Sequence, residues 1–552
     1  MARSPNMMAS GVAAGLLTLL GGQGAWAQAQ PAIAASPAQV LKRVVLLATP
    51  EASNPAGLPV EGAAVERDAA LVLSQAQASA VLQPLIGRPM DSQTLSAARA
   101  AVSSAYAGIG RPFVGVFIPR QDVTNGVLQL VVLEARLGKL QVMGARWFPE
   151  DSYREAVRLR PGQPIDAPQL QAGIDRLNRN PYRKVTVVAA PGETIGTTDI
   201  NLRVEDRRPF SVNAGLDNTG TDATGLYRGS LGFDWGDAFG RGDSLNYQFS
   251  GSVESAAVRQ HALAYSAGLP RGHSLNLSAS FARSRSDDDS IFSSTGDSII
   301  AAVRYGLPLP RRGAIEQSLT LGFDYKDTDN DILFGGVSVF PSRSQVEQLV
   351  VDYSLQASRA GVTGGVTATL VASPGGWSAH NDDAAFNLQR AGADSRYAYA
   401  RLSASGGLVL PRGAVWQTRL VGQVSDGPLL ASEQLSLAGV NAVRGFIEQG
   451  AVRDHGVVWR NELRAPAKAL GWPIDGGGSL SAYWFLDGAA GGNRRGLPGA
   501  SGAWTSLAAT GVGADLQLTP RSVFRISVGA PVLREGATGR TLAAQLGLQA
   551  AF

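Results

Sequence analysis

The chain has 552 residues, enough for several domains, and 44% of them are hydrophobic, which excludes a fully disordered protein. Its 49 Lys and Arg residues nearly balance 45 Asp and Glu residues, so the net charge is only +4, and no basic cluster supports nucleic-acid binding. Cysteine is absent, which excludes disulfide scaffolds, thiol catalysis and metal sites with cysteine ligands.

The first 27 residues are predicted to be a cleaved export signal. Arg3 supplies the positive start, residues 11–20 form a short apolar core, and Ala25-Trp26-Ala27 gives the small-residue cleavage pattern. The core is too short to span a bilayer, which argues against a membrane anchor. Residues 28–38 are then expected to form a flexible lead, and the mature chain is expected to lie outside the inner membrane.

Residues 39–206 are predicted to contain the same order of elements twice. In the first unit, residues 39–138, we expect a strand at 42–48, helices at 76–85 and 92–107, and strands at 113–118 and 127–133. In the second unit, residues 139–206, we expect a strand at 139–142, helices at 151–159 and 167–177, and strands at 185–189 and 199–204. Two units of one order in tandem indicate duplicated small α+β modules.

A short motif near the end of the first module resembles a known domain. Pro119-Arg120-Gln121-Asp122, with Leu133-Glu134 after it, is similar to the end of the first polypeptide-transport-associated (POTRA) domain of two-partner secretion transporters. Ala135 stands where that family usually has Gly. The second module resembles a second POTRA domain at 177–179, at 191–192, and at Asp199 and Leu202. Taken from the residues alone, Gln121 and Asp122 are turn formers.

Residues 207–552 change to an alternation of apolar and polar side chains, as in Leu245, Tyr247 and Phe249. A soluble sandwich would alternate in the same way, but a membrane barrel requires alternation throughout. Turn motifs at 269–272, 309–313 and 410–413 predict short connections, and polar stretches at 284–298, 327–344, 372–394 and 426–454 predict long loops. Short turns at one end and long loops at the other indicate a transmembrane antiparallel β-barrel, for which the length predicts about 16 strands.

The last predicted strand carries apolar side chains on one face. These are Leu542, Ala544, Leu546, Leu548, Ala550 and Phe552. Alternation that leads into Phe552 resembles the C-terminal aromatic signal that is recognised during outer-membrane barrel assembly. The resemblance implies that the barrel-assembly machinery is a partner during biogenesis.

The most specific motif is Val443-Arg444-Gly445-Phe446, within 426–454. It resembles the Val-Arg-Gly-Tyr/Phe tip of a loop that folds into the lumen of two-partner secretion transporters and their barrel-assembly relatives. Phe485-Leu486-Asp487 resembles the start of the partner motif on a later strand, Phe-x-Asp-x-Gly, although Gly488 and Ala489 depart from it. An Asp facing lipid is costly, so Asp487 is expected to point inward, where Arg444 is its natural bidentate partner. The alternative is a solvated loop Arg and an Asp at a strand end.

Taken together, these motifs identify the chain by resemblance as a two-partner secretion outer-membrane transporter, the TpsB class of the ShlB/FhaC/HecB haemolysin secretion/activation family. The resemblance implies an outer-membrane location, periplasmic POTRA domains, and a secreted partner exoprotein of the TpsA type: an adhesin, a haemolysin or a contact-dependent toxin. It also implies contact with outer-membrane lipid and lipopolysaccharide. The alternatives are a barrel-assembly insertase and a passive porin or surface adhesin. Many members carry a plugging helix before the first POTRA domain; with only residues 28–38 available, we expect the plug to be missing or rudimentary.

The remaining motifs give no reason to propose catalysis, a cofactor or a metal. The four His residues lack metal-ligand spacing, and there is no phosphate-binding loop or nucleophile elbow. The acidic groups at 287–289 and at Asp327, Asp329 and Asp331 are interpreted as solvated loop charge. Arg241-Gly242-Asp243 is interpreted as a turn and not as an adhesion tripeptide.

Overall fold

The computed structural model describes residues 39–194, 196–221, 224–287, 292–334, 337–448, 450–471, 478–494, 504–535 and 543–552. The predicted export signal at 1–27, the lead at 28–38 and the expectation about a plug lie outside these residues. The chain divides into two compact units, Met1–Arg208 and Pro209–Phe552, which are described separately. None of the helices in the described ranges is long and apolar enough to cross a lipid bilayer.

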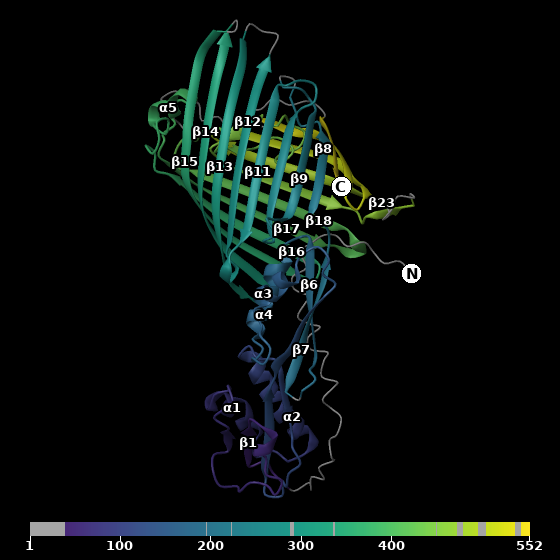
Figure 1. Ribbon diagram of the computed structural model, residues 1–552. Coiled ribbons are helices and arrows are strands. Elements are labelled where there is room, and N and C mark those ends of the chain that lie inside the picture. Colours follow the sequence, from purple (N-terminus) through teal and green to yellow (C-terminus); the bar gives the residue numbers. More distant parts are fainter. Residues whose placement is uncertain are drawn as a thin grey trace. The chain divides into compact units, whose positions relative to one another are not determined.

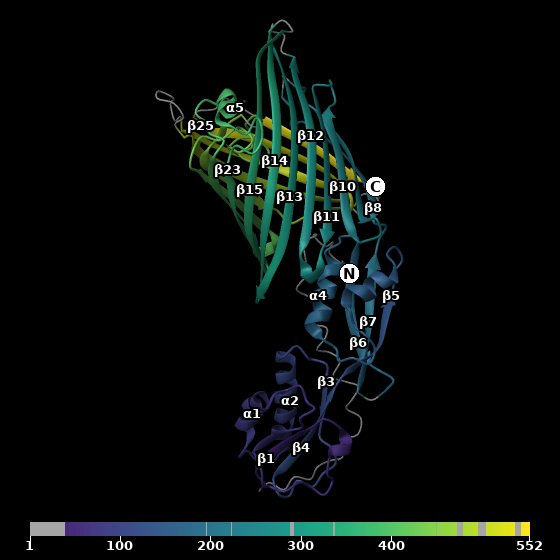
Figure 2. The ribbon, with the colours of Figure 1, turned by 60° about the vertical axis from the view of Figure 1, so that its left-hand side comes forward.

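The first module is a four-stranded sheet with two α-helices against it (Figure 2). The strands are β1 (Arg43–Leu47), β2 (Val65–Arg67), β3 (Val114–Phe117) and β4 (Val127–Glu134), in the order β2-β1-β4-β3. The helices are α1 (Gln75–Leu82) and α2 (Ser92–Gly108). Helix α2 begins where the Asp91 carboxylate accepts the Thr94 N–H, a hydrogen bond that also lowers the pKa of Asp91. Its buried face repeats every four residues, at Thr94, Ala98, Val102 and Tyr106, so one stripe packs on the sheet.

The second module is a three-stranded sheet with a helical hairpin. Strands β5 (Arg136–Met143), β6 (Arg183–Pro191) and β7 (Thr197–Asp206) have the order β5-β7-β6, and the helices are α3 (Glu150–Val157) and α4 (Ala167–Asn178). Strand β5 begins at Arg136, three residues before the expected boundary at 139. The buried Leu137 side chain explains this difference, because it packs in the second core and its backbone pairs with Thr198 of β7.

The second unit is a closed antiparallel β-barrel (Figure 1). Its strands are β8 (Phe210–Asp217), β9 (Arg228–Ala238), β10 (Asp243–Ser252), β11 (Val258–Gly268), β12 (Ser274–Asp287), β13 (Phe292–Arg312), β14 (Ile315–Phe334), β15 (Val337–Arg359), β16 (Val362–Ser373), β17 (Tyr397–Val409), β18 (Val415–Ser425), β21 (His455–Arg464), β22 (Lys468–Leu470), β23 (Gly478–Gly492), β24 (Thr505–Thr519), β25 (Ser522–Glu535) and β26 (Ala543–Ala551). Segments β21 and β22 both pair with β23, so they count as one interrupted strand and the described barrel has 16. The predicted barrel is confirmed.

Strand register gives the barrel wall its two faces. Tyr247, Leu263, Ala279 and Ala301 are successive partners across β10 to β13, which places them in one row. Large apolar side chains such as Leu263 and Val303 are exposed on this face. Asn246 of the opposite face donates to Asp234. An apolar exterior and a polar interior are what a barrel in lipid requires.

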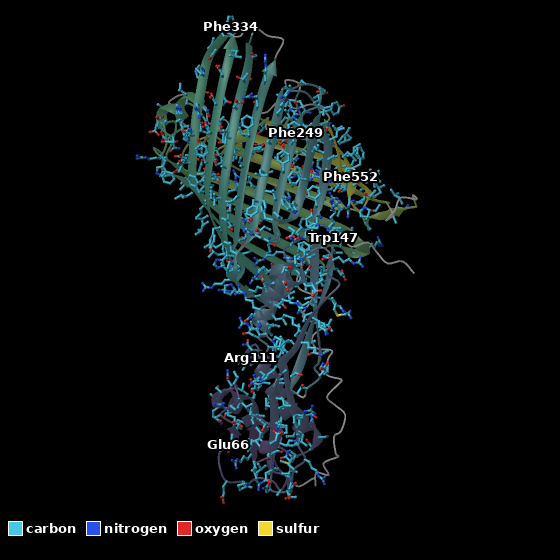
Figure 3. All side chains as sticks on the ribbon, viewed as in Figure 1. Glu66, Arg111, Trp147, Phe249, Phe334 and Phe552 are labelled. Carbon is cyan, nitrogen blue, oxygen red and sulfur yellow. The ribbon has the colours of Figure 1, made fainter. Side chains whose placement is uncertain are left out.

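Two of the predicted long loops are wrong. Residues 284–298 and 327–344 belong largely to the strands β12 to β15, which continue as paired hairpins, and Phe334 lies at the far end of β14 (Figure 3). At 20 residues, β14 is about twice as long as a membrane span requires, so its polar residues continue the strand into water. Asp327, interpreted from sequence as solvated loop charge, is buried and accepts Arg343 Nη2 at 2.7 Å.

The short connections occur where the turn motifs predict them. Arg271 and Arg412, in 269–272 and 410–413, have φ of 59° and 64°, and the Gly residue after each also has a positive φ. Glycine adopts this left-handed conformation without strain, which explains its place in both motifs. Arg241-Gly242 is also a turn, and Asp243 begins β10. The connection after β16 contains the short helix α5 (Asp383–Gln389).

Candidate functional site

Residues 426–454, between β18 and β21, are called the lumenal loop. Within it, two short strands, β19 (Leu435–Ser436) and β20 (Val452–Arg453), pair and hold its two arms together. Its buried apolar side chains pack on Val458, Ala489, Leu507 and Ala509 of the barrel wall. Val457 and Trp459, the neighbours of Val458 along β21, are exposed on the outer face, so the wall residues that contact the loop face inward. The loop is therefore folded into the barrel.

The motif Val443–Phe446 lies in the part of the loop that packs against the barrel wall. Val443, Arg444 and Phe446 are all buried. Gly445 has φ of 95°, and a Cβ atom there would lie 3.4 Å from the backbone carbonyl of Gly529 on β25. The left-handed backbone favours glycine here, and a Cβ atom would make an ordinary van der Waals contact with β25.

Arg444 and Asp487 form the predicted ion pair. Asp487, on β23, is 1% exposed and Arg444 is 3% exposed. Arg444 donates from Nε to Asp487 Oδ2 at 2.7 Å and from Nη2 to Oδ1 at 2.9 Å, and the Arg444 backbone N–H donates to Oδ2 at 3.3 Å. This is a bidentate, charge-assisted contact that joins the loop to the wall.

The Phe485 ring packs against the face of the same guanidinium. The Arg444 Cζ atom lies 3.8 Å from the centroid of the fully buried Phe485 ring, a cation–π contact. Phe485 and Asp487 face inward while Leu486 is exposed outside, as the alternation along the strand predicts. The departure at Gly488 and Ala489 leaves the ladder intact, because these residues pair with Trp459 and Val458 in continuous register.

Neighbouring strands carry residues that the sequence reasoning missed. Glu462 of β21 accepts Arg444 Nη1 at 2.6 Å and Arg464 Nε at 2.8 Å, and Arg464 Nη1 donates to Asp515 of β24 at 2.8 Å. The missed signal is in β21, where Arg460, Glu462 and Arg464 alternate with Trp459 and Leu463. Charges that alternate with exposed apolar side chains indicate the lumenal face of a barrel strand.

The POTRA-like motif organises a turn of the first unit. Gln121 and Gln129 of β4 are joined reciprocally, since Gln121 Nε2 donates to the Gln129 carbonyl and Gln121 Oε1 accepts the Gln129 N–H, both at 2.8 Å. Asp122 Oδ1 accepts the Thr124 N–H at 2.8 Å, and this bond lowers the pKa of Asp122. Pro119 begins the connection, where its carbonyl accepts Gln121 Nε2 at 3.3 Å.

Phe552 lies at the seam that closes the barrel. Its backbone N–H donates to the Val212 carbonyl at 2.8 Å, next to the pairing of β26 with β8. Its side chain is 71% exposed. Figure 3 labels this residue on the barrel. Leu542, the first of the six residues predicted for this row, lies outside the described residues.

Comparison with known proteins identifies the family of the chain. The family model "Haemolysin secretion/activation protein ShlB/FhaC/HecB" matches residues 196–516, and a model for the ShlB-type POTRA domain matches residues 61–135. The outer membrane transporter CdiB of Dickeya dadantii (strain 3937) is 29% identical over 401 residues, which are 70% of this chain and 68% of that protein. The hemolysin transporter protein ShlB of Serratia marcescens is 28% identical over 241 residues, 42% of each chain.

Solved structures show the same fold. CdiB from Escherichia coli superposes with a TM-score of 0.76 at 20% identity, covering 95% of this chain and 93% of that one. CdiB from Acinetobacter baumannii gives a TM-score of 0.64 at 16% identity, with 97% and 96% covered. The relatives are transporters, so the barrel-assembly insertase is not favoured. The chain therefore belongs to the ShlB/FhaC/HecB haemolysin secretion/activation family, and it is an outer-membrane transporter of two-partner secretion that carries a partner exoprotein from the periplasm to the cell surface.

Proposed function

We propose that the lumenal loop is the gate of this transporter and that the Arg444–Asp487 ion pair sets its resting position. The observation that carries the proposal is the buried bidentate contact between the loop and β23. The loop occupies the lumen, so a polypeptide cargo has to displace it. Once the pair is lost, the loop samples other positions in the lumen. Ions then pass around it, whereas export of a polypeptide is impaired because the loop is no longer held in its resting position.

The cargo is proposed to be an extended TpsA-type exoprotein, namely an adhesin, a haemolysin or a contact-dependent toxin. Its secretion domain binds two POTRA domains, residues 39–138 and 139–206, before the chain enters the barrel at 207–552. The strand order supports this role, because β2 and β3 are the edge strands of the first sheet and β5 and β6 are those of the second. Such edges can hold an extended segment by strand addition. No catalytic step, cofactor or metal takes part, and folding outside the cell favours export.

The barrel exterior is proposed to contact outer-membrane lipid and lipopolysaccharide. Its exposed apolar side chains, such as Leu263, Val303 and Leu402, support this. During biogenesis the barrel-assembly machinery recognises the region around Phe552, whose ring is exposed at the closing seam.

Deleting the gene identifies the cargo. We expect one large exoprotein to disappear from the culture medium while the other outer-membrane barrels keep their abundance, as measured by quantitative proteomics of both fractions. A general loss of outer-membrane barrels would instead support an insertase.

The periplasmic modules are expected to bind the cargo without the barrel. Each of the two sheets within residues 39–206 packs on an apolar core of its own, which supports their folding as a fragment. Titration of this fragment with the secretion domain of the identified exoprotein, followed by calorimetry, should give saturable binding. No association at high micromolar concentration, with both partners shown to be folded by circular dichroism, contradicts the prediction.

Substituting Phe552 is expected to impair assembly more than stability. Its backbone bonds to Val212 remain in Phe552→Ala, whereas the exposed ring offered to the assembly machinery is lost. The amount of heat-modifiable barrel in the outer membrane should fall several-fold, and the assembled fraction should denature at the wild-type temperature. Phe334→Ala is the matched control, because Phe334 is also an exposed aromatic at a strand end. Equal yields for the two variants would rule out the recognition role.

A further inference from the structure

A second buried carboxylate joins the first arm of the lumenal loop to a different part of the wall. Glu433, just before β19, is 1% exposed. Its Oε1 accepts Lys326 Nζ of β14 at 2.5 Å, and its Oε2 accepts the Tyr399 hydroxyl of β17 at 3.0 Å and Gln348 Nε2 of β15 at 3.1 Å. Three strands therefore supply donors to a single loop side chain.

The wall side of this contact is held in place by further hydrogen bonds. The Gln348 amide oxygen accepts the Tyr397 hydroxyl at 2.7 Å, and its Nε2 also donates to Asp324 at 3.1 Å. Asp324 is in turn paired with Arg304 at 2.6 Å. The carboxylates of Glu433 and Asp324 are balanced by the cations Lys326 and Arg304. The wall therefore presents a fixed site for one carboxylate from the loop.

The backbone of the same arm is fixed as well. Gln423 Nε2 of β18 donates to the carbonyls of Glu433 and Asp454, both at 3.1 Å, and so joins the beginning and the end of the loop. Arg401 Nε holds the Gln423 amide oxygen at 2.8 Å. The arm that carries Glu433 is therefore positioned by the wall and not by the loop tip.

We propose that Glu433 is a second anchor of the lumenal loop, independent of Arg444, and that the gate opens only when both anchors release. The proposal rests on the proposed gating function of the loop. The two anchors share no partner among the described residues: Glu433 binds β14, β15 and β17, whereas Arg444 binds β21 and β23. Contacts without shared partners contribute additively to a free energy, so their effects on the open-to-closed ratio multiply.

The test is single-channel conductance of the purified full-length chain in planar lipid bilayers, which requires no cargo. Glu433→Gln keeps the side-chain volume and removes the charge, so the open-to-closed ratio should rise about tenfold, as for one lost charge-assisted hydrogen bond. Asp487→Asn should give a rise of similar size, and combining the two should give about the product, roughly a hundredfold. Arg444→Ala combined with Asp487→Asn should give no more than either alone, because both belong to one anchor.

Each outcome decides a separate point. A normal ratio for Glu433→Gln, with a raised ratio for Asp487→Asn, overturns the second anchor and leaves the gate intact. A normal ratio for Asp487→Asn overturns the proposed gate itself. A double variant that does not exceed the larger single effect shows that the anchors are not independent.

Two further variants keep the test interpretable. Lys326→Met removes the wall cation and should also raise the ratio, and it carries the test if Glu433→Gln does not fold, as judged by heat-modifiability. Glu316→Gln is the matched control, because Glu316 is an exposed carboxylate on β14 that pairs with Arg311 and does not touch the loop. Its ratio should equal that of the wild type.

Discussion

Arg444→Ala and Asp487→Ala are each expected to reduce secretion at least tenfold while the barrel still assembles. Each substitution breaks the bidentate contact and leaves the remaining buried charge with fewer hydrogen bonds, which should destabilise the resting position of the loop by about 1–3 kcal/mol. Because both residues act through one contact, the double variant should be little worse than either single variant. The measurement is exoprotein in the medium, normalised to folded transporter in the outer membrane.

Conservative substitution sharpens this prediction. Arg444→Lys should not restore secretion fully, because an ammonium group cannot reproduce the two parallel bonds to Asp487 and the third bond to Glu462. Exposed Arg311, near the end of β13, provides the control because it pairs with Glu316 and is far along the chain from the loop, and Arg311→Ala should secrete normally. If the two single defects multiply in the double variant, Arg444 and Asp487 act independently, and the proposal that their ion pair holds the loop is wrong.

Phe485→Ala is expected to have an effect at least as large. Truncating a fully buried Phe typically costs about 3–5 kcal/mol, and here it also removes the ring face on which the Arg444 guanidinium rests. The loop tip should then lose its contact with the inner face of β23, so secretion should fall more than tenfold. Limited proteolysis of the purified barrel should show faster cleavage within residues 426–454.

The neighbouring residue is a matched control for this variant. Leu486 lies next to Phe485 on β23 but faces outward, so Leu486→Ala should leave secretion and proteolysis close to wild type. Phe485→Leu separates volume from the cation–π contact, since it keeps most of the apolar bulk and lacks the ring. Equal secretion from Phe485→Ala and Leu486→Ala would mean that the inner face of β23 does not position the loop.

The sequence by itself determined the local elements and the class of fold. Helix α2 begins at the residue after Asp91 because the cap and the four-residue apolar spacing are both local properties. Alternation along each strand likewise predicted the barrel and its inward and outward faces, because side chains alternate across any β-strand. The resemblance of Val443–Phe446 and Phe485–Asp487 to a paired family motif also led to the Arg444–Asp487 contact, although 43 residues separate them.

Only the tertiary structure decided which polar side chains meet inside the lumen and where strands end. Lys326 and Glu433 are 107 residues apart, and nothing local to either predicts their contact. Their meeting depends on the register of β14, β15 and β17, because a shift of two residues moves a side chain by roughly 7 Å along its strand. The length of the hairpin that ends at Phe334 was also decided by pairing with neighbouring strands, since a polar segment in water can form a loop or a strand with equal local preference.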